Sequence, residues 1–102
     1  MRLENYPIEK LKKEIKEIVN RHLDLKLYRI FFFGSRVTGK GNEGSDIDVG
    51  IEGPAETSNA VFSKIKEEIE YIPILYKIEI VDFKKVSPDF RQVALQKIEE
   101  IK

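Results

Sequence analysis

The sequence predicts a small α/β domain in which amphipathic helices pack against one sheet of three strands. Apolar residues recur at helical spacing in three segments, residues 8–23, 61–72 and 90–101. Three others have the alternating or continuous apolar pattern of strands, residues 28–33, 47–52 and 75–83. With one short helical turn expected after the first strand, the order is α-β-α-β-α-β-α. We find no internal repeat and no linker, so residues 1–102 are expected to form a single domain.

The helices are predicted from their apolar faces and from two start signals. Ser58 is expected to cap the second long helix. Ser87, Pro88 and Asp89 place a hydroxyl cap, a proline and an acid where the last helix should begin. The apolar face of the first helix is formed by Ile8, Leu11, Ile15, Ile18, Val19 and Leu23. The last helix is expected to present Phe90, Val93, Ala94, Ile98 and Ile101.

The strand segments differ in how many of their faces should be buried. Residues 28–33 (YRIFFF) are mostly aromatic or β-branched, so a helix or a partner must cover their second face as well. Residues 47–52 (IDVGIE) alternate, as do residues 75–83 (LYKIEIVDF). Between the first two strands, residues 34–45 contain four glycines, which predict a helical turn followed by a mobile loop.

Composition excludes several classes of function. Lys plus Arg and Asp plus Glu both number 18, so bulk charge gives no reason to expect direct binding of nucleic acid. Cysteine is absent, which excludes disulfides, thiolate metal sites and cysteine nucleophiles. The N-terminal residues lack the apolar core of a signal peptide, and no apolar run approaches the length of a membrane span. A cytoplasmic protein without membrane association is expected.

The residues that carry chemistry lie at the end of the first strand and along the second. Gly34 lets a backbone approach a phosphate closely, and the Ser35 hydroxyl and the following N–H groups can hold phosphate oxygens. Asp46 and Asp48 are two positions apart on a strand, so both carboxylates face one side, roughly 6.5–7 Å apart along the strand. Such a pair can bind one magnesium ion or lie between two.

Three further residues complete the predicted site. Asp82 lies in the third strand between apolar neighbours and is the candidate third carboxylate. Arg36 and Ser45 are candidate phosphate contacts, with an ordinary solvated arginine and a loop-orienting serine as the alternatives. If Ser35 and Asp46 meet one triphosphate, the first two strands must run antiparallel, so the sheet should be antiparallel or mixed.

Taken together, Gly34-Ser35, the segment Ser45-Asp46-Ile47-Asp48 and the segment Ile80-Val81-Asp82 resemble the minimal nucleotidyltransferases of the DNA polymerase β superfamily. The resemblance spans residues 28–90 and includes the order of the elements. It implies a nucleotidyltransferase palm, ATP as donor and two Mg²⁺ ions held by Asp46, Asp48 and Asp82. It further implies that Asp82 helps to deprotonate the acceptor and that Gly34 and Ser35 hold the β- and γ-phosphates.

The resemblance also implies a partner. Short members of this family are often the antitoxin of a toxin–antitoxin pair, and the toxin is a helical HEPN-domain ribonuclease that becomes adenylylated on a tyrosine. An alternative is a binding module of the same fold that covers its partner with little turnover.

Two segments come close to other known binding motifs, but neither matches fully. Residues 34–41 (GSRVTGKG) approach a Walker A loop, but Gly41 stands where the magnesium-binding Ser or Thr is required. The run SDIDVGIE resembles a calcium loop, yet it lacks the third acid and alternates as a strand does.

Overall fold

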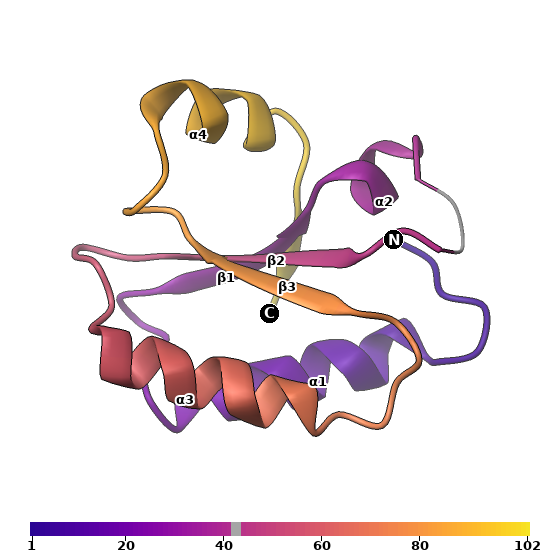
Figure 1. Cartoon of the computed structure of the whole chain (residues 1–102), viewed down its shortest axis with the longest axis horizontal. Coiled ribbons are helices and arrows are strands. Elements are labelled where there is room, and N and C mark those ends of the chain that lie inside the picture. Colours follow the sequence, from indigo (N-terminus) through magenta and orange to yellow (C-terminus); the bar gives the residue numbers. More distant parts are fainter. Residues whose placement is uncertain (42–43) are drawn as a thin grey trace.

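The structure, a computed structural model, describes residues 1–41 and 44–102. Helices and strands alternate along most of the chain (Figure 1). In chain order they are α1 (Ile8–Asn20), β1 (Arg29–Phe33), α2 (Ser35–Thr38), β2 (Ile47–Glu52), α3 (Asn59–Glu70), β3 (Ile78–Asp82), α4 (Pro88–Ala94) and β4 (Glu99–Ile101). The mobile loop expected after α2 runs through residues 42 and 43, which lie outside the described residues.

The strands form one mixed sheet in the order β3-β2-β1-β4. β1 is antiparallel to both β2 and β4, whereas β2 and β3 are parallel. The parallel pair is joined by α3, which is the crossover that parallel neighbours need. An antiparallel or mixed sheet was predicted, with the first two strands antiparallel, and the structure confirms the mixed alternative.

The fourth strand was not predicted. Ile98 and Ile101 were assigned to the last helix, but α4 ends at Ala94 and residues 99–101 pair with β1 instead. Ile98, just before β4, packs on the second apolar cluster, whereas Ile101 at the end of β4 belongs to the main core on the other side of the sheet. This pairing provides hydrogen-bond partners for the backbone N–H and C=O groups along the free edge of β1. The gain from these bonds outweighs the helix preference of the local sequence.

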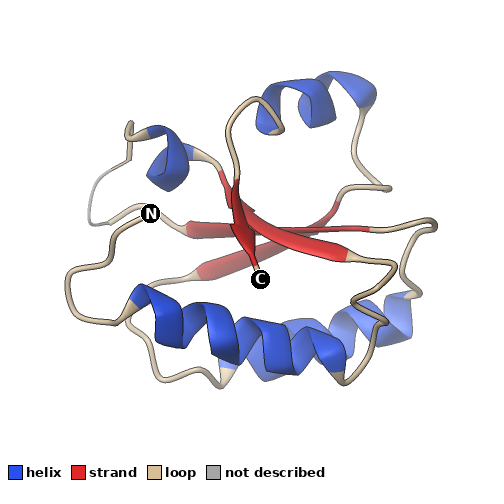
Figure 2. Ribbon diagram, turned by 180° about the vertical axis from the view of Figure 1, so that it is seen from behind, coloured by secondary structure: helices blue, strands red, loops and turns tan. Residues whose placement is uncertain are grey.

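Helices α1 and α3 cover one face of the sheet, and α4 lies over the other face together with the short α2 (Figures 1 and 2). Among the described residues, none of the helices has the length and hydrophobicity that a membrane span requires.

The side chains of α1 and α3 pack with the sheet into the main core. The core is formed by Leu11, Ile15, Ile18, Val19, Ile30, Phe32, Ile47, Val49, Ile51, Ile65, Ile69, Ile72, Ile80 and Ile101.

The phenylalanines of β1 are divided between the two faces. Phe32 belongs to the main core, whereas Phe31 and Phe33 form a second cluster with Phe83. Phe90 of α4 packs on this cluster, with its ring centroid 6.1 Å from Phe33 and 5.9 Å from Phe83. The second face of β1 is therefore covered by a helix of the same chain, as the apolar pattern required.

Both predicted caps are confirmed. The Ser58 hydroxyl accepts a hydrogen bond from the Val61 N–H at 3.1 Å, and the Ser87 hydroxyl accepts one from the Phe90 N–H at 3.1 Å. Each bond satisfies one of the backbone donors that the first turn of a helix leaves without a partner. The start of α4, and with it the position of Phe90, is therefore set locally.

Candidate functional site

Gly34 directly follows β1 and lies against Asp48 of β2. Phe33 and Asp48 are partners in the antiparallel register, so the residue after Phe33 lies beside the Asp48 side chain. Gly34 has φ 83° and ψ −164°, and a Cβ at this position would lie 2.2 Å from Asp48 Oδ2. Only glycine combines this backbone conformation with the necessary space. The phosphate turn and the carboxylate predicted from sequence are therefore in contact.

Ser35 begins α2, and the chain folds back onto it. Its carbonyl oxygen accepts hydrogen bonds from the N–H groups of Lys40 and Gly41, both at 3.0 Å. A Cβ on Gly41 would lie 3.0 Å from the hydroxyl oxygens of both Ser35 and Ser45. The two serines that were predicted as phosphate contacts are thus brought to the same small space around Gly41.

Arg36 holds the rim of the site in place. Its Nε donates a 2.7 Å hydrogen bond to the carbonyl oxygen of Ser45, and its guanidinium carbon lies 4.5 Å from the centre of the Tyr76 ring. These contacts connect α2 to the segment that enters β2 and to the segment that precedes β3. In this structure Arg36 therefore positions the backbone around Asp46 and Asp48.

Three carboxylates gather at one end of the sheet. Asp46 is exposed just before β2, while Asp48 is half-buried and is the register partner of Glu79 in β3. Burial raises the pKa of Asp48, and the negative charges of Asp46 and Glu79 raise it further. Lys77 lies close to this group, with its Nζ 2.7 Å from Glu79 Oε1. Negative charge is concentrated where a cation would relieve it.

Asp82 lies elsewhere. It is the register partner of Ile51, three positions along the strands from the pair of Asp48 and Glu79 and on the opposite face of the sheet. Its Oδ2 accepts hydrogen bonds from the N–H and the hydroxyl of Thr57, at 2.8 and 2.9 Å, and its Oδ1 accepts one from the Lys84 N–H at 2.9 Å. The side chain is 4% exposed. The structure therefore does not bring Asp82 to Asp46 and Asp48.

Glu79 occupies the place that was expected for Asp82, and the sequence contained a signal for it. An α-helix between β2 and β3 predicts a parallel crossover, in which both strands begin at the same edge of the sheet. The acid near the start of β3 should then lie beside the acids at the start of β2. Asp82, at the end of β3, was chosen because of its apolar neighbours, and these neighbours reflect burial under the connecting loop.

Asp48 and Glu79 line a cleft of about 720 Å³ between α2, α4 and the sheet. One part of its wall is polar and includes the Gly34-Ser35 turn, Asp48 and Glu79. The other part is apolar and is formed by α4 and the sheet beneath it. The lining residues are Phe33, Gly34, Ser35, Thr38, Lys40, Asp48, Glu79, Val81, Phe90, Val93, Ala94, Gln96 and Lys97.

The residues present fit a magnesium site by their chemistry. Mg²⁺ prefers carboxylate and phosphate oxygens and is usually held by one or two carboxylates together with substrate phosphates. Within residues 1–41 and 44–102, no three His, Cys, Asp or Glu side chains form a ready metal cage. Like charges separate when nothing lies between them, so the ion and the nucleotide would have to draw Asp46, Asp48 and Glu79 together.

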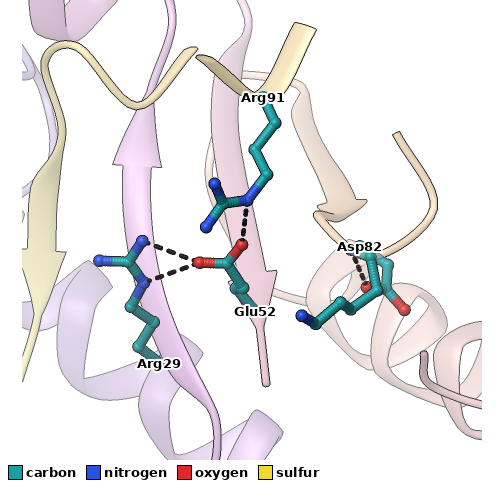
Figure 3. Close-up of polar contacts among 5 residues, drawn as sticks. Arg29, Glu52, Asp82 and Arg91 are labelled. Carbon is teal, nitrogen blue, oxygen red and sulfur yellow. Dashed lines mark hydrogen bonds and ion pairs between the residues drawn. The ribbon is translucent and has the colours of Figure 1, made fainter. Parts of the chain in front are cut away.

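An ion network at the far end of β2 connects Glu52 to Arg29 of β1 and to Arg91 of α4 (Figure 3). Glu52 is 9% exposed, and its Oε2 accepts a 2.6 Å hydrogen bond from Arg91 Nε of α4. Its Oε1 accepts bonds from Arg29 Nη2 and Nε, at 2.8 and 3.2 Å. Burial raises the pKa of Glu52, but the two arginines outweigh it and leave that pKa below the ordinary value. Because α4 buries none of its residues fully, this network is a main attachment to the sheet.

Both the sequence and the fold of this chain match known proteins. Residues 13–102 match the family described as polymerase beta, nucleotidyltransferase. The chain is 29% identical over 66 residues to a protein of Haemophilus influenzae named "Probable protein adenylyltransferase MntA". That alignment covers 65% of this chain and 58% of the relative, so the chain matches little more than half of the relative's length.

Two solved structures share the fold. A chain of a toxin–antitoxin complex with AMP-PNP superposes with a TM-score of 0.71 and 19% identity, covering 89% of this chain and 72% of that chain. A chain of the complex between the tri-AMPylated HEPN toxin of Shewanella oneidensis and its MNT antitoxin superposes with a TM-score of 0.69 and 16% identity, covering 92% and 71%. The family match covers most of the sequence and includes the Gly34 turn and all three clustered carboxylates, and this chain belongs to the polymerase β nucleotidyltransferase family.

Proposed function

We propose that this protein transfers AMP from ATP, with Mg²⁺, to a hydroxyl group of a HEPN-domain partner, and so acts as an antitoxin. The observation that carries the proposal is the meeting of the Gly34 turn with Asp48 and Glu79 at one cleft. Membership of the nucleotidyltransferase family supports the reaction class. The adenylyltransferase relative and the two toxin–antitoxin complexes support the donor and the kind of partner.

In this proposal Asp46, Asp48 and Glu79 hold two magnesium ions. Bound there, the ions would neutralise the triphosphate and increase the electrophilicity of the α-phosphorus. Glu79 replaces Asp82 as the third carboxylate, because Asp48 and Glu79 are adjacent while Asp82 is occupied by Thr57 and Lys84.

The phosphate half of the site consists of Gly34, Ser35 and the residues that support them. Gly34 allows the backbone to lie against the β- and γ-phosphates, and the Ser35 hydroxyl donates to a phosphate oxygen. Arg36 and Ser45 hold the surrounding segments together through their own hydrogen bond. Lys40, which lines the cleft, adds positive charge on this side.

The transfer forms one bond and breaks one. The acceptor oxygen attacks the α-phosphorus, the bond from the α-phosphorus to the bridging oxygen breaks, and pyrophosphate leaves with the electron pair. The proton of the acceptor hydroxyl passes to a base, and Glu79 is the residue that we assign to this role. Water in the cleft would compete with the acceptor hydroxyl as the nucleophile, and a bound partner would displace this water.

The test is the transfer of label from ATP to a purified HEPN-domain protein, the kind of partner seen with the MNT antitoxin. With Mg²⁺, we expect label to move from [α-³²P]ATP but not from [γ-³²P]ATP, because AMP is transferred and pyrophosphate is released. Asp48→Asn should abolish transfer. Glu100→Gln, an exposed acid on β4 that does not line the cleft, is the matched control and should keep the wild-type rate.

The outcomes separate the proposal from its alternative. Transfer that survives Asp48→Asn would show that these carboxylates do not form the active site. If the two proteins form a stable complex without any transfer of label, the chain acts as a binding module of the same fold.

A further inference from the structure

We propose that the apolar half of the cleft binds the nucleobase of the donor nucleotide, with Phe90 of α4 as the ring against which the base packs. This inference rests on the proposed function, since it concerns the same nucleotide. It adds a subsite to the phosphate turn and the carboxylates, which account only for the charged part of the ligand.

The first observation is the placement of exposed apolar side chains. Among the described residues, five large hydrophobic side chains are exposed, and two of them, Phe90 and Val93, line this cleft. Phe90 is 45% exposed and Val93 is 66% exposed. Both lie in the same cavity as Asp48 and Glu79. Apolar surface that faces a polar catalytic group is the pattern of a pocket that buries the uncharged part of a ligand.

The second observation is that Phe90 is held firmly while still accessible. Its ring packs edge to face against Phe33, with planes at 87°, and lies at 55° to the ring of Phe83. A ring anchored on two buried rings loses little further freedom when a ligand binds. Stacking of a base on such a ring requires no particular sequence of donors and acceptors, because every base has a π-face.

The third observation is that α4 presents a continuous surface. Phe90, Val93 and Ala94 are three and four positions apart, so they share one face of the helix. Gln96 and Lys97 follow in the next turn of chain and line the same cleft. An apolar wall with a few polar groups at its end can hold and orient a heterocycle. Arg91, on the neighbouring side of α4, is bound to Glu52 and keeps this face turned toward the cleft.

The size and composition of the cleft favour a nucleotide as its occupant. Its volume of about 720 Å³ is within the range of roughly 300–1,000 Å³ that is usual for cofactor-sized ligands. Its lining combines a glycine turn and carboxylates with an aromatic ring and aliphatic side chains. A nucleoside triphosphate carries the matching groups in one molecule, a polyanion at one end and a flat aromatic base at the other.

The experiment compares two ligands that differ only in the base. Binding of ATP and of ribose 5-triphosphate, both with Mg²⁺, is measured by calorimetry on the whole chain. Phe90→Leu keeps an apolar side chain on Phe33 and Phe83 but removes the ring. We expect it to weaken ATP binding roughly tenfold, as loss of a stacked ring does, and to leave ribose 5-triphosphate binding unchanged. Phe90→Tyr should restore the affinity for ATP.

Val93→Ser tests the same apolar wall with little risk to folding, because Val93 is largely exposed and contributes little to the core. It should weaken ATP binding several-fold without changing the binding of ribose 5-triphosphate. Leu27→Ser is the control, since Leu27 is 60% exposed and does not line the cleft. That variant should bind both ligands as the wild type does.

The inference is overturned if Phe90→Leu and Val93→Ser leave ATP binding unchanged while Ser35→Ala weakens it. It is also overturned if either variant weakens both ligands equally, because the effect would then act on the phosphate half. Failure of the wild type to bind either ligand with Mg²⁺ would instead overturn the proposed function, and the subsite with it.

Discussion

Asp48 of β2 and Glu79 of β3 lie side by side, as partners in the register of two parallel strands. On its other side, Asp48 is the register partner of Phe33 and contacts Gly34. One half-buried carboxylate is therefore shared between the acidic strands and the phosphate turn. Changes at Asp48, at Glu79 or at Gly34 should each disturb ligand binding, whereas changes at Asp82 or Gly39, which do not line the cleft, should affect only stability.

Glu79→Gln and Asp82→Asn test which acid completes the site. Glu79→Gln should lower Mg-ATP affinity or the transfer rate by about 100-fold, the upper end of losses seen when groups around a metal are changed. Asp82→Asn weakens the bonds to Thr57 and Lys84 and should lower the free energy of unfolding by about 1–3 kcal/mol. The rate of label transfer per folded molecule, combined with urea unfolding, separates the two effects. A loss of transfer in Asp82→Asn with intact stability would return Asp82 to the site.

Gly34→Ala and Gly39→Ala form a matched pair. Both glycines have positive φ, 83° and 82°, so both variants should lose about 1–3 kcal/mol of stability through backbone strain. Only at Gly34 would the new Cβ meet Asp48, because nothing lies within 4 Å of a Cβ at Gly39. Gly34→Ala should therefore also abolish the thermal stabilisation by Mg-ATP. Equal stabilisation of both variants by Mg-ATP would contradict the contact between turn and carboxylate.

Asp48→Asn should stabilise the protein in the absence of metal. The pKa of Asp48 is raised in the folded state by burial, Asp46 and Glu79, so the folded state binds this proton more tightly than the unfolded state does. The contribution of Asp48 to stability is therefore lost as the pH rises from its ordinary pKa of 3.8 through the raised value. At neutral pH the variant should melt higher than the wild type, and adding Mg²⁺ with ATP should reverse the order. Calorimetry with and without ligand measures both, and a lower melting temperature for metal-free Asp48→Asn would disprove the charge repulsion.

Glu52→Gln should loosen α4. The folded-state pKa of Glu52 is lowered, with burial opposed by the stronger effects of Arg91 and Arg29. Its contribution to stability is present above the ordinary pKa of 4.5 and is lost as the pH falls through the lowered value. Glu52→Gln should therefore be less stable than the wild type at neutral pH, with a difference that shrinks in acid. In this variant, hydrogen exchange of the α4 amides should accelerate more than that of the α1 amides. An equal acceleration in both helices would show that Glu52 does not stabilise α4 locally.

Much of the fold could be predicted from local patterns. The apolar periods located the helices and three strands, and the hydroxyls of Ser58 and Ser87 marked two helix starts that the structure confirms. Gly34-Ser35 and the pair Asp46 and Asp48 were recognisable because each depends only on residues close together in the sequence. β4 was missed because residues 98–101 have a helical pattern, and only the free edge of β1 makes them a strand.

Local sequence patterns were enough to locate the helices, three of the four strands, the Gly34-Ser35 turn and the spacing of the two aspartates, since these follow from the preferences of neighbouring residues. Tertiary structure decided which third carboxylate joins them, because β2 and β3 are brought into register by the crossover through α3. Asp82 and Glu79 are both acids of the β3 segment, yet they are three positions apart on the strand and therefore lie on opposite faces of the sheet. The orientation of α4, which depends on the distant pair Arg91 and Glu52, was likewise set by folding.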